Sequence, residues 1–174
     1  MNLIYLDKVV IPAVQLDRND AIFDLHTEVK SDEDDINLSI PDGIDIHVRV
    51  RKVEDDLLTD IHIKGWGFFL CDRCCEPFKR EIKGRIQTVF TRDRSKIEED
   101  NDDYQYWDGS EKGIDITQDV LDVILLSIPV KMLCSESCKG LCDHCGQNLN
   151  ESTCRCEQET HDPRWDALKN IKFD

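Results

Sequence analysis

Residues 44–70 read IDIHVRVRKVEDDLLTDIHIKGWGFFL, and the first seven of them alternate strictly between apolar and polar side chains. The apolar positions are Ile44, Ile46, Val48 and Val50. An alternation with period two predicts a β-strand that turns one face to the core and the other to water. The polar turn at 54–56 is followed by a second apolar run that ends at Leu70. The stretch therefore predicts two consecutive strands.

A third strand is predicted after Pro77, because four apolar side chains beyond it share one parity. These side chains are Phe78, Ile82, Ile86 and Phe90. The short connections favour an antiparallel arrangement. Residues 95–113 lose this periodicity and are rich in acidic residues, so we interpret them as a mobile acidic loop.

A helix is predicted to begin at Thr117, as its cap, and to end at Pro129. Asp162 and Pro163 are typical of the start of a second, terminal helix. The predicted fold class is α+β, with an antiparallel β-meander or partly closed β-barrel, one long helix and a C-terminal cysteine-rich zinc module. We expect residues 1–130 to form the core of sheet and helix, and residues 131–174 to form the zinc-binding module.

The chain of 174 residues is strongly acidic, with 22 Lys and Arg against 37 Asp and Glu and a formal net charge of −15. Such a charge argues against broad binding of a phosphate backbone, which depends on lysine and arginine. It suits a basic protein partner, and it leaves room for a local RNA contact. The N-terminal residues lack the features of a signal peptide, and no apolar stretch is long enough to span a membrane. We therefore expect a cytoplasmic protein.

Eight of the nine cysteines have spacings that are typical of metal ligands. Six lie between Cys134 and Cys156 in the pattern C-x3-C-x3-C-x2-C-x8-C-x-C, and Cys71 and Cys74 form an upstream C-x2-C pair. In a reducing cytosol, clustered cysteines indicate metal binding rather than disulfides. Zinc is the expected cofactor, as one or two structural ions, because it accepts four thiolates in a tetrahedron.

We expect the cysteines to divide into two sites. The first comprises Cys71, Cys74, Cys134 and Cys138, and the second comprises Cys142, Cys145, Cys154 and Cys156. Mixed pairings, or one metal with several free thiols, are alternatives. Four protein ligands leave no open position for substrate, which indicates a structural role. His144 is expected to face solvent, and Cys75 to be a small buried residue.

The sequence gives little sign of catalysis. It has no H-E-x-x-H, no G-x-S-x-G, no P-loop and no dinucleotide fingerprint. A redox pair at Cys71 and Cys74 is an alternative, but that chemistry favours a helix after the first cysteine, and a strand is predicted there. We expect no enzymatic activity.

One basic strip stands out around the predicted third strand. Its candidate contact residues are Arg73, Lys79, Lys83 and Arg85. The strip is interpreted either as a solvated strand face or as a surface that contacts RNA phosphates or an acidic partner.

Several motifs resemble the YceD family, a bacterial and plastid group. They are Cys71-Asp72-Arg73-Cys74 with Glu76-Pro77-Phe78, Ile128-Pro129-Val130, Cys138-Lys139-Gly140-Leu141-Cys142, Cys145-Gly146-Gln147-Asn148-Leu149-Asn150, Cys154-Arg155-Cys156 and Asp162-Pro163-Arg164. The resemblance implies a role in accumulation of large-subunit ribosomal RNA. It also implies that the C-terminal cluster is a stability module, since some members lack it.

These observations together predict a non-catalytic factor for ribosome biogenesis. We expect it to contact a ribosomal protein or a large-subunit precursor particle through its acidic surface, with ribosomal RNA touched locally at the basic strip. The alternatives are a zinc-ribbon adaptor for the transcription machinery and a C-x2-C redox enzyme.

Overall fold

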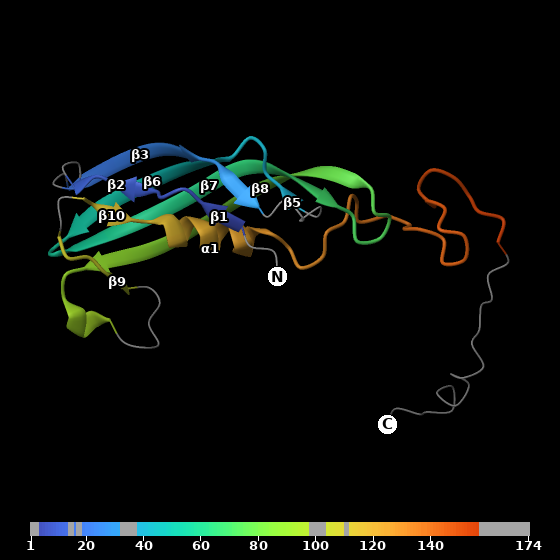
Figure 1. Ribbon diagram of the computed structural model, residues 1–174. Coiled ribbons are helices and arrows are strands. Elements are labelled where there is room, and N and C mark those ends of the chain that lie inside the picture. Colours follow the sequence, from blue (N-terminus) through green and yellow to red (C-terminus); the bar gives the residue numbers. More distant parts are fainter. Residues whose placement is uncertain are drawn as a thin grey trace, which may run out of the picture.

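The computed structural model describes residues 4–13, 16, 19–31, 38–97, 104–109 and 112–156. Within this part of the chain the largest unit is a six-stranded sheet with the order β3-β6-β7-β8-β9, and β5 pairs with β7 (Figure 1). Its strands are β3 (Asp20–Thr27), β5 (Leu38–Ser39), β6 (Ile44–Val53), β7 (Asp56–Leu70), β8 (Pro77–Thr91) and β9 (Tyr104–Tyr106).

Three long strands form the centre of the sheet as an antiparallel meander. Strand β6 alternates between buried and exposed side chains from Ile44 to Arg51, as its sequence predicts. Val53 pairs with Asp56, so the first hairpin has a two-residue connection, where Glu54 adopts a φ of 57°. Leu70 pairs with Pro77, so residues 71–76 form the second connection, which carries three cysteines, Cys71, Cys74 and Cys75.

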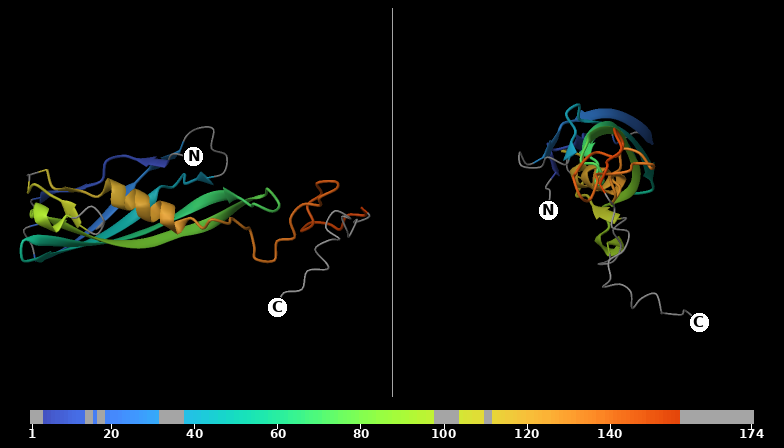
Figure 2. Two further views of the ribbon diagram at one scale, coloured as in Figure 1. Left: turned by 90° about the horizontal axis from the view of Figure 1, so that it is seen from below. Right: turned by 90° about the vertical axis from the view of Figure 1, so that its right-hand side faces the viewer.

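One face of the sheet is covered by α1 (Thr117–Ser127), as Figure 2 shows from below. Val120, Val123 and Ile124 of the helix are buried in the core with the apolar side chains of β6, β7 and β8. Gly84 of β8 lies under the helix, and a Cβ there would come within 2.7 Å of the Val123 Cγ2 atom. The missing side chain thus allows the helix to approach the strand closely.

Two small antiparallel sheets and a 3-10 turn accompany this core. Strand β1 (Ile4–Leu6) pairs with β4 (Val29–Ser31), and β2 (Val10–Ile11) pairs with β10 (Ile114–Asp115). The 3-10 turn η2 spans Arg94–Lys96. Among the described residues, no helix is long and apolar enough to cross a lipid bilayer.

An acidic side chain is buried between α1 and β8. Asp119 is 2% exposed, and its Oδ1 atom accepts hydrogen bonds from Thr88 Oγ1 at 2.7 Å and Gln105 Nε2 at 2.8 Å. Its Oδ2 atom has no hydrogen-bond partner among the described residues. Burial raises the pKa of this carboxyl above its ordinary value, against the lowering effect of both donors.

The structure confirms the predicted meander and corrects several other expectations. In the described part of the chain the sheet is open and not a barrel, because the β9 edge and the β3 edge do not pair with each other. The helix is short, with 11 residues. Ile116 occupies the N-cap position without a side-chain cap, and Thr117 Oγ1 instead accepts the Val9 N–H at 2.9 Å.

The predicted acidic loop contains a strand. Tyr104–Tyr106 form β9, which pairs in parallel with β8 and makes the sheet mixed. The loop prediction is therefore wrong for these three residues. The predicted terminal helix at Asp162 lies outside the described residues, and the boundary at residue 130 stays a prediction.

Candidate metal centres

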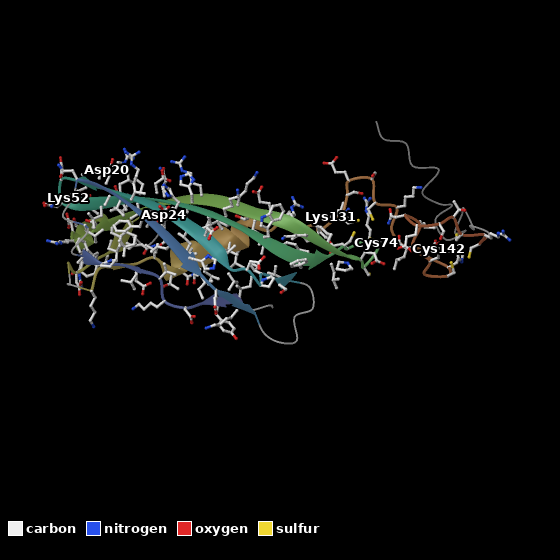
Figure 3. The ribbon with its side chains drawn as sticks, turned by 90° about the horizontal axis from the view of Figure 1, so that it is seen from above. Asp20, Asp24, Lys52, Cys74, Lys131 and Cys142 are labelled. Atoms are coloured by element: carbon white, nitrogen blue, oxygen red, sulfur yellow. The ribbon has the colours of Figure 1, made fainter. Side chains whose placement is uncertain are left out.

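The structure gathers eight cysteines into two groups that could each hold a metal ion. Within each group, the Sγ atoms all lie within 4.8 Å of one another. The first group is Cys71, Cys74, Cys134 and Cys138, and the second is Cys142, Cys145, Cys154 and Cys156. This grouping is the one that the sequence led us to expect. Figure 3 labels Cys74 at the end of the sheet and Cys142 beyond it.

The first group closes the far end of the β7–β8 hairpin. Its turn is tied by hydrogen bonds from the Cys75 N–H to the Cys71 carbonyl at 2.8 Å and from the Cys71 N–H to the Glu76 carbonyl at 3.0 Å. The chain after α1 returns to this turn, where the Asp72 carboxylate accepts the Met132 N–H at 2.6 Å. Cys134 and Cys138 thereby reach the sulfurs of Cys71 and Cys74.

The second group repeats the same turn. The Gly146 N–H donates to the Cys142 carbonyl at 2.9 Å, and the Cys142 N–H donates to the Gln147 carbonyl at 2.8 Å. The residue after the second cysteine has a positive φ in both turns, 57° at Cys75 and 72° at Gly146. Two C-x2-C turns far apart in the sequence thus present their thiols in the same way.

The spacing of the sulfurs fits a tetrahedral ion. Zinc–sulfur bonds of about 2.3 Å place the corners of a tetrahedron about 3.8 Å apart. The measured Sγ–Sγ distances are 3.7 Å for Cys71 and Cys138, and 3.7 Å for Cys74 and Cys134. In the second group, Cys142 and Cys154 are 3.5 Å apart. Both donor sets therefore suit an ion that prefers four thiolates.

The electrostatics of the first group favour a cation. Burial opposes ionisation of Cys71, but the N–H groups of Cys134 and Arg73 outweigh it and lower its pKa to about 6. Although the Glu76 N–H favours the thiolate of Cys74, burial and the neighbouring sulfurs raise the pKa of that thiol to about 12. Thiolates this close repel one another, so a divalent ion is needed to keep all four ionised.

The second group has the same pattern. The N–H groups of Cys145 and His144 lower the pKa of Cys142 to about 7. The Cys145 sulfur raises the pKa of Cys156 to about 12. Each group thus contains at least one thiol with a lowered pKa, and the charge of an ion would allow the others to ionise as well.

Hydrogen bonds around the sulfurs also link the two groups. Asn150, which follows the second turn, donates through Nδ2 to the Cys138 Sγ atom at 3.4 Å, and its Oδ1 accepts the Lys139 N–H at 2.8 Å. Such contacts orient metal ligands. The Arg73 guanidinium donates to the Cys138 carbonyl at 2.8 Å. The sequence pattern did not predict this contact between Asn150 and a ligand of the other group.

The remaining cysteine and the nearby histidine lie outside both groups. Cys75 is exposed, so the prediction that it is buried is wrong. Its positive φ turns the side chain out of the turn. His144 is also exposed and belongs to neither group.

The predicted contact residues are spread over one surface of β8 and its loop. Lys79, Lys83 and Arg85 share the exposed face of β8. Arg85 donates both Nε and Nη2 to Asp60, each at 2.7 Å, so much of its charge is balanced. The hydrogen bond from Arg85 is the main cause that lowers the pKa of Asp60, and the charge of Arg85 adds to it. The Lys83 Nζ atom lies 3.3 Å from Glu81 Oε2. The Lys79 Nζ atom lies over the rings of Trp66 and Phe68.

A family model described as "Large ribosomal RNA subunit accumulation protein YceD" matches residues 60–172, which include both cysteine groups. The chain belongs to the YceD family. Membership suggests a role in accumulation of large-subunit ribosomal RNA.

Relatives of the chain occur in bacteria and in plants. An uncharacterized protein of Mycobacterium tuberculosis is 29% identical over 157 residues, which covers 87% of this chain and 74% of the relative. The Large ribosomal RNA subunit accumulation protein YCED homolog 1, chloroplastic, of Arabidopsis thaliana is 38% identical over 61 residues, or 35% of this chain and 19% of the relative. The protein of the same name in Zea mays is 30% identical over 115 residues, or 50% and 39%. No solved structure matches the chain.

Proposed function

We propose that this protein is a non-catalytic factor of ribosome biogenesis that supports accumulation of large-subunit ribosomal RNA. The observation that carries the proposal is the family match, which spans both cysteine groups and most of the meander. The names of the plant relatives point in the same direction. We propose that it acts in the cytoplasm.

Two zinc ions are proposed as structural cofactors, one in each four-cysteine group. Four thiolate ligands leave no coordination position for substrate or water, so the ions would supply stability rather than catalysis. The first ion would hold the β7–β8 hairpin to the segment after α1, and the second would hold residues 142–156 in shape. Metal analysis is expected to give two zinc ions per chain, with eight thiols protected from alkylation. One ion, or a disulfide formed under reducing conditions, would contradict this assignment.

The main contacts are proposed to be with protein rather than with RNA. A net charge of −15 repels a phosphate backbone and attracts a basic surface. Ribosomal proteins that bind RNA carry such surfaces, so an acidic factor can meet one of them on a large-subunit precursor particle. The described cations of β8 then offer a smaller, local contact to RNA.

The proposal is tested by depleting the protein and measuring both ribosomal RNAs. Large-subunit RNA is expected to fall relative to small-subunit RNA, and tagged protein is expected to sediment with large-subunit precursors. An unchanged ratio, with no such co-sedimentation, would reject the proposal. Co-purification with RNA polymerase instead would favour the zinc-ribbon adaptor.

The redox alternative has little geometric support. Cys71 and Cys74 are 1% and 3% exposed, and the next element is β8 rather than a helix. A reactive cysteine pair needs an accessible thiolate, commonly at a helix N-terminus. Thiol titration with and without a chelator distinguishes a metal-protected pair from a redox pair.

A further inference from the structure

Two large aromatic side chains stand on the face of the sheet that α1 leaves uncovered. Trp66 is 43% exposed and Phe68 is 42% exposed, whereas Ile63 and Phe69 of the same strand are buried on the opposite face. At these two positions β7 pairs with β8 on one side, and on the other side the short strand β5 pairs with Phe68, because β6 pairs with β7 only as far as Gly65. Figure 3 looks onto this face. Neither core packing nor the metal centres account for the exposure of the rings.

Lysine side chains surround the two rings. Lys79 of β8 lies directly opposite Phe68, and its Nζ atom is 5.1 Å from the centre of the Trp66 ring and 5.6 Å from that of Phe68. Contacts of this kind hold a cation over an aromatic face. Lys64 and Lys83 are cross-strand neighbours whose side chains are 69% and 75% exposed. They share one acid, Glu81, at 3.7 Å and 3.3 Å.

Basic side chains gather near the rings although the chain as a whole is acidic. Lys64, Lys79 and Lys83 lie on this face with Glu81, whereas the whole sequence has a net charge of −15. Opposite Phe68 on the other side lies Ser39 of β5, which is small. Phe68 therefore has a lysine on one flank and a short side chain on the other.

We propose that Trp66, Phe68 and the lysines around them bind a short stretch of single-stranded RNA. Bases stack on the two rings, and phosphates contact Lys64, Lys79 and Lys83. Exposed aromatic side chains on the open face of a sheet are a recurrent platform for unpaired bases, because every base has a flat face. The proposal deepens the proposed function, on which it rests, by naming the surface and the form of RNA.

The spacing of the rings fits unpaired nucleotides. Residues two apart on a strand are about 6.6–6.8 Å apart, which is about twice the 3.4 Å rise per nucleotide in a stacked strand. Neighbouring bases must therefore unstack to meet one ring each, which a single strand can do and a duplex cannot. An acidic peptide would be attracted by the lysines but would leave the two rings without a role. Single-stranded RNA uses both features.

The experiment measures binding of the full-length zinc-loaded protein to a fluorescein-labelled 12-nucleotide single-stranded RNA of mixed sequence, with the matching duplex as competitor. Trp66→Ala and Phe68→Ala are each expected to weaken binding about 5- to 150-fold, the range for loss of one stacked base. Trp66→Phe is expected to restore most of the affinity because it keeps a ring. The duplex is expected to compete poorly.

A matched control comes from the same face of the sheet. Ile22 of β3 is 59% exposed, and Ile22→Ala is expected to leave the affinity unchanged. Salt provides a second readout, because three lysine contacts to single-stranded RNA predict a slope of about −2 for the logarithm of the binding constant against that of salt concentration. Lys79→Ala is expected to reduce the magnitude of this slope by about 0.7.

Normal affinity of Trp66→Ala, or loss of affinity in the lysine variant alone, would overturn the proposal. The second result would indicate a surface for an acidic protein. Displacement of the RNA by a poly-glutamate peptide would indicate the same, if the ring substitutions left the RNA affinity unchanged. Expressing Trp66→Ala in depleted cells tests the RNA-binding surface separately from the proposed function. If wild-type protein restores large-subunit RNA and the variant does so equally, the RNA platform is wrong and the proposed function stands. If wild-type protein itself has no effect on that RNA, the proposed function fails.

Discussion

Replacing Cys142 by serine tests whether a metal ion folds the second cysteine group. Between residues 141 and 156, Cys142 is the one side chain that is buried. Ordering a residue costs about 1–2 kcal/mol in backbone entropy, and this segment has almost no apolar burial to offset that cost. A structural zinc ion contributes about 10–16 kcal/mol in model peptides. Residues 142–156 therefore depend on the ion.

The expected effect of Cys142→Ser is large but local. Removing even about 4 kcal/mol of that contribution would raise the open population about 1000-fold, because 1.4 kcal/mol corresponds to a factor of ten, and complete loss of the ion would raise it further. Cleavage by trypsin after Arg155 follows this population when opening is fast. We expect cleavage close to the rate of chelator-treated wild-type protein, and a fall in bound zinc from two ions to one. The melting temperature of the sheet should change by no more than about 4 °C, the effect of about 1 kcal/mol.

Cys75→Ser is the matched control, because Cys75 is exposed and lies outside both groups. It is expected to keep two zinc ions and wild-type resistance to trypsin. Cys71→Ser should instead lower the melting temperature of the sheet as well, because Cys71 belongs to the group that closes the β7–β8 hairpin. Unchanged trypsin resistance in Cys142→Ser, with one zinc ion lost, would refute the reasoning, since the segment would then hold its shape without the ion.

Three further substitutions test the core. Because burial raises the folded-state pKa of Asp119, its contribution to stability is present below the unfolded pKa and is lost as the pH rises through the folded value. Asp119→Asn should therefore gain stability relative to wild type as the pH rises from 4 to 7, by about 1.4 kcal/mol for each unit of the shift, in urea unfolding at several pH values; a constant difference would contradict this. Gly84→Ala should cost about 1–3 kcal/mol because the new Cβ meets Val123 of α1, and an unchanged urea midpoint would show that the helix can move away. Ile61→Ala, at a fully buried position, should cost about 2–5 kcal/mol, and a cost below 1 kcal/mol would mean that the site collapses freely.

The meander and the cysteine grouping were predictable because both depend on local patterns. The alternation that begins at Ile44 determines which face of β6 is buried, and the short connections determine the neighbouring strands. The parity of β7 also carried a signal that was not used. Ile61, Ile63 and Phe69 share the buried face, so Trp66 and Phe68 fall on the exposed one.

Other features depend on contacts that no local pattern reveals. Strand β9 is three residues long, too short for a period, and it forms only because β8 offers a free edge. The exposure of Cys75 follows from a left-handed backbone at a position where most residues would not adopt one. Asp119 can be buried because Thr88 and Gln105, which lie elsewhere in the sequence, donate hydrogen bonds to it.

The length of the β7–β8 hairpin has a mechanical consequence. Strand β6 pairs with β7 only as far as Gly65, and beyond that point β5 contributes two residues of pairing. A two-stranded ribbon is barely stable alone in water. The end of the hairpin is therefore held mainly by the four sulfurs of the first group. Releasing them would let the two strands separate from that end as far as Trp66 and Phe68. With the proposed ions in place, the stiffness of this end of the protein would depend on the supply of metal.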